Sequence, residues 1–117
     1  MKFLYLFNRQ AYGNSLAREA LDMALATAAF DQDVSLVFCH DALYQLLITQ
    51  NTANTESKAH IGIINALPLY DIENIYYLEE DRHDRNIDPQ SIFKQATPLA
   101  RTELKNLLKT SECIQSF

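Results

Sequence analysis

The chain has 117 residues and a formal net charge of −5 at neutral pH, and 48% of its residues are hydrophobic. This length favours one domain over residues 1–117, and the presence of only two glycines and three prolines argues against a disordered or collagen-like chain. No apolar run approaches the ~20 residues of a membrane span, and no basic stripe is available to neutralise phosphates, so we expect neither a membrane protein nor direct nucleic-acid binding.

The expected compartment is the cytoplasm. Residues 1–8 are apolar, but they carry neither the charged start nor the small-residue cleavage site of a signal peptide. The two cysteines are too few for the disulfide framework that is typical of small secreted domains.

Two buried strands separated by a helix are predicted for the first forty residues. Lys2–Asn8 is rich in apolar and aromatic residues, and Val34–Cys39 is an apolar run typical of a parallel strand buried on both faces. A helix is expected from about Leu16 to Phe30, with Asn14 or Ser15 as its N-cap. Its inward face is expected to carry Ala17, Leu21, Ala24 and Ala28.

A short helix, a polar loop and a longer helix are predicted next. Asp41 is placed to cap a short helix that buries Leu43, Leu46 and Leu47. Thr49–Lys58 is wholly polar, which indicates an exposed loop. Ala59–Leu67 is expected to be helical, with Ile61 and Ile64 facing inward.

The next segments are predicted to be two strands joined by an acidic loop. Ile75–Leu78 is expected to form a third strand. The charged segment Glu79–Asp88 is interpreted as a solvated loop, and Ser91–Ala96 as a fourth, weaker strand.

The last third of the chain is expected to end in a helix and a strand. Thr97 as a cap with Pro98 at the first helical position predicts a helix that continues over Leu99–Lys109, and Cys113–Phe117 is predicted to be a short strand. Strands alternating with helices at this spacing indicate a single three-layer α/β domain, flavodoxin-like, with a mostly parallel sheet of about five strands.

No metal ion and no cofactor are expected. His40, His60 and His83 are about twenty residues or more apart, and the chain has no Cys-x-x-Cys motif. The loop Arg9–Ser15 occupies the place where flavodoxin-like proteins hold a flavin phosphate, but its single glycine and few hydroxyl groups disfavour flavin binding.

Five segments carry a family resemblance that extends over nearly the whole chain. They are REALDMALATAAF, FCHDALYQLL, ALPLYDIENIYYLEE, NIDPQ followed by ATPL, and ECIQSF. In this order and spacing they resemble the DsrE/DsrF-like family, and within it the C-type subunits of TusBCD sulfur-relay complexes. The resemblance implies a DsrE-like fold.

The resemblance also implies a function. It implies a heterohexamer with TusB-like and TusD-like subunits, which passes persulfide sulfur from a TusA-like donor to a TusE-like acceptor for 2-thiolation of the wobble uridine of certain tRNAs. In this family the D-type subunit carries the transferring cysteine in the loop after the second helix. The corresponding loop here, Thr49–Lys58, has no cysteine, so the chain is expected to be a non-catalytic subunit without catalytic residues of its own.

Cys39 leaves an alternative open. Sulfur transfer needs an exposed thiolate with a lowered pKa, and Cys39 has His40 beside it and a helix start just beyond. The surrounding apolar run favours a buried cysteine instead, and Asp41 is explained by capping. A small sulfurtransferase that acts alone through Cys39 is therefore the second hypothesis, and a DsrF-like subunit in dissimilatory sulfur oxidation is a close variant of the first.

Overall fold

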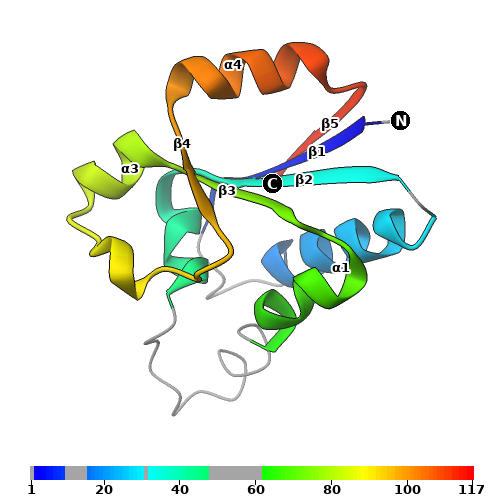
Figure 1. The fold of residues 1–117 in the computed structure, drawn as a ribbon, viewed down its shortest axis with the longest axis horizontal. Helices are drawn as coiled ribbons and strands as arrows, with labels where there is room; N and C mark the ends of the chain where they lie inside the picture. Colours follow the sequence, from blue (N-terminus) through cyan, green and yellow to red (C-terminus); the bar gives the residue numbers. More distant parts are fainter. Residues whose placement is uncertain (1, 10–15, 31, 48–61) are drawn as a thin grey trace.

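The computed structural model describes residues 2–9, 16–30, 32–47 and 62–117. These residues contain one sheet of five parallel strands in the order β4-β3-β2-β1-β5 (Figure 1). The strands are β1 (Lys2–Phe7), β2 (Asp33–Phe38), β3 (Asn74–Leu78), β4 (Thr97–Leu99) and β5 (Cys113–Ser116). The predicted α/β domain with a parallel sheet of about five strands is confirmed.

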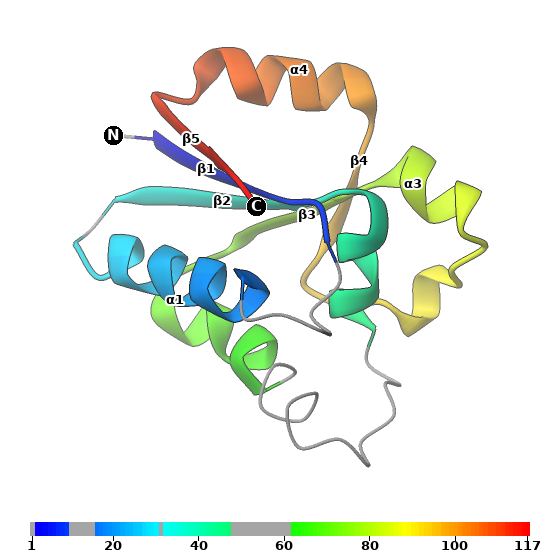
Figure 2. The same cartoon turned by 180° about the vertical axis from the view of Figure 1, so that it is seen from behind.

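Helices cover both faces of this sheet (Figures 1 and 2). One face carries α1 (Leu16–Ala28) and the helical residues 62–66, which continue into the 3₁₀ turn η2 (Leu67–Tyr70), whereas α4 (Arg101–Thr110) lies on the other face. The remaining elements are η1 (His40–Leu46), α3 (Glu79–Asp84) and η3 (Pro89–Ser91). None of the described helices is both long and apolar enough to cross a membrane.

The hydrophobic clusters on the two faces of the sheet differ in size. Strand side chains alternate between the faces, and on the α1 face the rings of Phe7 and Phe38 stack with centroids 4.7 Å apart inside the larger cluster. On the α4 face a smaller cluster includes Val37 and Cys39. The predicted α4 leucines pack against this cluster but are only half-buried; they are Leu104, Leu107 and Leu108.

The fourth strand lies later in the chain than expected. The prediction of a strand over Ser91–Ala96 is wrong: a 3₁₀ turn begins at Pro89, and Ile92 makes one isolated antiparallel bridge to Leu47. Thr97 and Pro98 belong to β4, so they do not start a helix. Proline fits this position because β4 is an edge strand, where a missing backbone N–H costs little. The helix α4 begins at Arg101.

The first six residues of the acidic segment form a helix, so the prediction of a solvated loop over Glu79–Asp88 is wrong. Helix α3 starts directly after β3 with Glu79, Glu80 and Asp81 in its first turn. Carboxylates are favoured there because the helix dipole is positive at its N-terminus. Asp81 is only 3% exposed, so this turn is packed against the domain.

Several sequence predictions lie outside the described residues. The N-cap candidates Asn14 and Ser15, most of the loop Arg9–Ser15, the loop Thr49–Lys58 and His60 belong to this group. Ala17 lies in α1, but its side chain is not described, whereas Leu21 and Ala24 are fully buried as predicted. Ile64 is also buried as expected.

Candidate functional site

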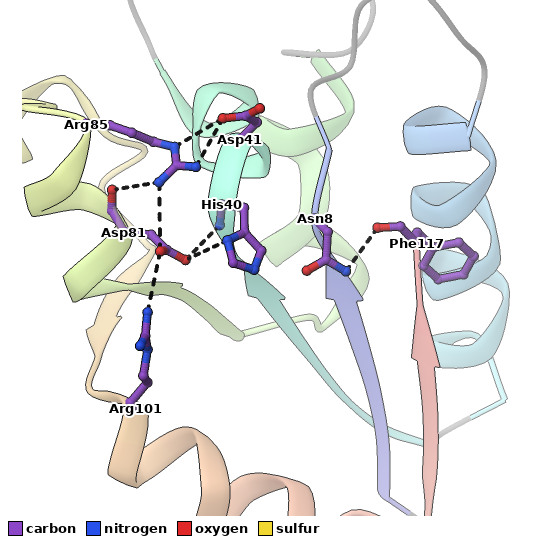
Figure 3. Close-up of polar contacts among 7 residues, drawn as sticks. All are labelled: Asn8, His40, Asp41, Asp81, Arg85, Arg101 and Phe117. Carbon is purple, nitrogen blue, oxygen red and sulfur yellow. Dashed lines mark hydrogen bonds and ion pairs between the residues drawn. The ribbon is translucent and has the colours of Figure 1, made fainter.

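The carboxyl ends of the central strands bring together the polar residues that follow them. Chain segments leaving parallel strands meet at the same edge of a sheet, which is where ligands of such folds usually bind. Here His40 and Asp41 follow β2, Asp81 and Arg85 follow β3, and Arg101 begins the helix after β4 (Figure 3). These five residues, which follow three neighbouring strands, form one cluster that we call the Asp81 network.

Asp81 is the centre of this network. Its Oδ2 accepts a 2.7 Å hydrogen bond from the backbone N–H of His40, and the Nδ1 of His40 lies 3.7 Å from the same oxygen. Its Oδ1 lies 3.8 Å from Arg85 and 3.9 Å from Arg101. A buried carboxylate is costly unless it is paired and hydrogen-bonded, and these contacts meet that requirement.

Asp41 does not cap the helix that it was expected to cap. It lies inside η1, and the residue at the N-cap position of η1 is Cys39, which makes no side-chain capping bond. The Asp41 carboxylate instead contacts the guanidinium of Arg85, with Nη2 and Nε at 3.1 and 3.2 Å from its Oδ1. The carboxylate that satisfies the first N–H of η1 comes from Asp81, 41 positions further along the chain.

Arg85 and Arg101 differ in how far their charges are exposed. Arg85 is 22% exposed and bridges Asp41 to Asp81, and it also donates to the backbone oxygen of Asp81 at 3.3 Å. Arg101 is 60% exposed, and its backbone N–H donates to Glu80 at 3.0 Å. This second contact ties the start of α4 to α3, so Arg85 and Arg101 link the three elements that surround the cluster.

Cys39 lies beneath the network and is 5% exposed. Burial is the largest of the effects that together raise the pKa of its thiol from 9.0 to about 11; the negative charge of Asp81 acts in the same direction, and Arg101 opposes it in part. The site therefore favours the neutral thiol, whereas a persulfide carrier needs a thiolate. The second cysteine, Cys113, starts β5 and is half-buried.

Together with Asp41 and Arg101, His40 is one of three exposed members of the network. Its side chain is 59% exposed, and its backbone has a positive φ of 51°, which turns the chain sharply as it leaves β2. Beyond it, the side chain of Asn8 holds the last strand by donating to the backbone oxygen of Phe117 at 3.2 Å (Figure 3). The His40 imidazole therefore meets solvent next to the buried Cys39.

Within the described part of the chain, no three residues of the ligand type are grouped so that they could hold a metal ion. His40 faces a single carboxylate, that of Asp81, and His83 is an exposed residue of α3. The chemistry available to the cluster is that of a structural ion network with one solvent-facing imidazole.

The sequence analysis missed Asp81, Arg85 and Arg101 as members of one cluster. A usable signal was present, because three acids followed by Arg82 and His83 match the charge order of a short helix. Nothing in the sequence paired Asp81 with His40, since that contact depends on β2 and β3 being neighbours.

The sequence of the whole domain has known relatives. The DsrE/DsrF-like family matches residues 1–115. The chain belongs to the DsrE/DsrF-like family. This confirms the resemblance found in the sequence, and the match extends from the first strand into the last one.

Members of the DsrE/DsrF-like family with similar sequences include proteins named TusC. A TusC homolog of Vibrio vulnificus is 30% identical over 113 residues, which cover 97% of this chain and 96% of that protein. TusC of Shigella flexneri and TusC of Escherichia coli O9:H4 are each 32% identical over 117 residues, with 99% of this chain and 98% of each protein covered.

Among solved structures, the YchN protein of E. coli has the same fold as this family member. The two structures superpose with a TM-score of 0.79 over 100% of both chains, at 16% sequence identity. This similarity supports the fold and adds nothing about activity.

Proposed function

We propose that the chain is a non-catalytic, structural subunit of a TusBCD-type sulfurtransferase complex, which relays persulfide sulfur for 2-thiolation of the wobble uridine of tRNA. The relatives named TusC, similar over almost the full length, support this assignment. Membership of the DsrE/DsrF-like family supports the broader role in sulfur relay.

The burial of Cys39 is the observation that supports the non-catalytic role. With a pKa of about 11, the fraction of thiolate at neutral pH is on the order of one in ten thousand. A thiol attacks a persulfide only as its thiolate, so this cysteine is poorly suited to relay. The loop Thr49–Lys58 contains no cysteine that could replace it.

The proposal includes partners and a compartment. The chain would assemble with TusB-like and TusD-like subunits into a heterohexamer, reach a TusA-like donor and a TusE-like acceptor through that complex, and work in the cytoplasm without a cofactor. Phe30, Leu69 and Tyr70 are large apolar residues with more than half of their surface exposed, and aromatic residues are enriched in protein interfaces.

Reconstitution of the complex tests the proposal. The chain is co-expressed with its B-type and D-type partners, and sulfur transfer to the acceptor is measured for the wild type, for Cys39→Ala and for Cys113→Ala as a matched control. We expect assembly and transfer to survive both substitutions. Loss of transfer in Cys39→Ala, in a complex that still forms, would show that the Cys39 thiol takes part in the chemistry.

Two alternatives are separated by further measurements. A small sulfurtransferase that acts alone would show a persulfide on Cys39 when the purified chain is incubated with a persulfide donor and analysed by mass spectrometry. A DsrF-like subunit of dissimilatory sulfur oxidation would leave the 2-thiouridine content of tRNA unchanged when its gene is deleted. The proposed function requires no persulfide on Cys39 in the first experiment and a loss of 2-thiouridine in the second.

A further inference from the structure

A cavity of about 600 Å³ lies at the β4 edge of the sheet, away from the Asp81 network. Its lining residues are Tyr77, Pro89, Gln90, Ile92, Phe93, Lys94 and Ala96. Tyr77 comes from β3, and the other residues belong to the segment between α3 and β4, coloured yellow to orange in Figure 1. A volume of this size falls within the range of small-molecule sites in proteins.

The wall of the cavity is held in place by its own hydrogen bonds. The N–H of Phe93 donates to the backbone oxygen of Leu46 at 2.8 Å, and the N–H of Ala96 donates to that of Phe93 at 3.0 Å. At the other end, Asp88 accepts a bond of 3.0 Å from the N–H of Gln90. Ile92 is 3% exposed. The cavity is therefore formed before any ligand arrives, which lowers the cost of binding.

Tyr77 lines the cavity and carries an unused polar group. Its side chain is 5% exposed, and its hydroxyl makes no hydrogen bond to any residue that the structure describes. Buried hydroxyl groups normally have a partner. Burial and the nearby carboxylate of Glu79 raise the pKa of Tyr77, so the hydroxyl stays protonated at neutral pH and is available as a donor.

The negative charge of Glu79 does not prevent a hydrogen-bond acceptor of a ligand from approaching the Tyr77 hydroxyl. The guanidinium of Arg82 donates to the Glu79 carboxylate at 2.8 Å through Nε, and this bond lowers the pKa of Glu79. The pair is thus close to neutral as a unit. Arg82 also donates to the backbone oxygen of Ile87 at 2.8 Å, so each of its three guanidinium nitrogens already has an acceptor.

The rim of the cavity carries a positive charge. Lys94 and Gln90 are exposed lining residues, and Lys94 makes no ion pair within the described ranges of the chain. The other lining residues include Pro89, Ile92 and Phe93, whose side chains are apolar. The lining of the cavity therefore combines a neutral hydroxyl donor, a cation and apolar side chains.

We propose that this cavity binds a flat, largely apolar organic acid, with a hydrogen-bond acceptor directed at the Tyr77 hydroxyl and a carboxylate directed at Lys94. The flat apolar part of this acid, for example an aromatic ring, packs between Phe93 and Pro89. The cavity shares no residue with the Asp81 network, and the proposed binding goes beyond the proposed function.

Three probes of the same shape test the proposal. 6-Hydroxy-2-naphthoate has both polar groups, 2-naphthoate lacks the acceptor, and 6-hydroxy-2-naphthamide lacks the charge. Binding to the full ¹⁵N-labelled chain is followed by NMR, and we expect 6-hydroxy-2-naphthoate to bind with a Kd of about 1 mM or tighter. The shifted amides should be those of Tyr77 and of residues 90–96.

Two variants and a control then assign the contacts. Tyr77→Phe should remove the advantage, about fivefold, of the hydroxylated over the unhydroxylated naphthoate. Lys94→Gln should remove the advantage, about threefold, of the carboxylate over the amide. Lys105→Gln changes an exposed lysine of α4 on the other face of the sheet, and it should leave both ratios unchanged.

Three outcomes would overturn the proposal. The first is that 6-hydroxy-2-naphthoate causes no amide shifts at several times the expected Kd. The second is that the shifts lie outside the cavity. The third is that both affinity ratios persist in Tyr77→Phe and Lys94→Gln. If the cavity amides respond to a partner subunit and not to 6-hydroxy-2-naphthoate, the cavity is a protein contact and the proposal is wrong.

Discussion

The backbone N–H of His40 is held by the side chain of Asp81 at 2.7 Å, although the two residues are 41 positions apart in the chain. The bond joins the turn after β2 to the helix after β3. Because Asp81 also faces two arginines, one carboxylate connects the segments that leave three neighbouring strands.

Replacing Asp81 by alanine should lower the free energy of unfolding by about 2–4 kcal/mol. The substitution leaves the N–H of His40 and the half-buried Arg85 without their buried partner, and uncompensated buried groups carry a large penalty. Urea unfolding followed by circular dichroism measures the change.

Asp84→Ala is the matched control, since Asp84 is an exposed residue of the same helix. It should change stability by less than about 0.5 kcal/mol. Equal losses in the two variants would show that helix formation, and not the network, depends on these carboxylates.

The two cysteines should differ in their reactivity toward alkylating reagents. Cys39 is buried with a raised pKa, whereas Cys113 is half-buried at the start of β5. Mass spectrometry after treatment with iodoacetamide should show modified Cys113 first, and Cys39 should react at a comparable rate only in urea. Rapid modification of native Cys39 would contradict the burial of this thiol.

The raised pKa of Cys39 predicts a loss of stability at alkaline pH. The unfolded chain, with an ordinary thiol pKa of 9.0, loses this proton before the folded chain, whose pKa is about 11. The contribution of the protonated Cys39 thiol to the free energy of unfolding is complete below pH 9.0 and is lost as the pH rises to about 11. The expected loss in the free energy of unfolding is about 3 kcal/mol.

Other groups also titrate in this range, so the comparison is made with Cys39→Ala. Urea unfolding of both proteins is measured across this pH range, and the free energy of unfolding should decline less for the variant than for the wild type. Parallel curves would mean that the thiol has the same pKa in both states.

Tyr77→Phe and Tyr5→Phe should have opposite effects on stability. The Tyr5 hydroxyl bonds to that of Thr27 at 2.6 Å, so its removal should cost about 1 kcal/mol. The Tyr77 hydroxyl has no partner within the described part of the chain, so its removal should be neutral or stabilising by up to about 1 kcal/mol. Both residues are buried on the same sheet face, and thermal unfolding compares them directly. A clear loss for Tyr77→Phe would reveal a partner for this hydroxyl.

The regular elements of the sheet could be predicted because their signals are local. The apolar runs at β1, β2 and β3 alternate with helix patterns, and they indicate parallel strands without any knowledge of contacts. The apolar setting of Cys39 likewise indicated a buried thiol, which the structure shows at 5% exposure.

The segment between β3 and α4 could not be predicted in the same way. Pro98 is compatible with a helix start and with an edge strand, and the choice depends on whether β3 has a free edge. Similarly, Glu79–Asp84 is polar enough for a loop, but packing of Asp81 against η1 makes it a helix.

Sequence alone was sufficient for the fold class and the family, because both follow from the order of apolar runs and from whole-length similarity. The Asp81 network and the cavity beside Tyr77 required the folded chain. Both are assembled from residues far apart in sequence, at places where neighbouring strands end or where a sheet edge is covered. Strand order decides which side chains meet there, and strand order is set by the packing of the whole domain, which no local pattern records.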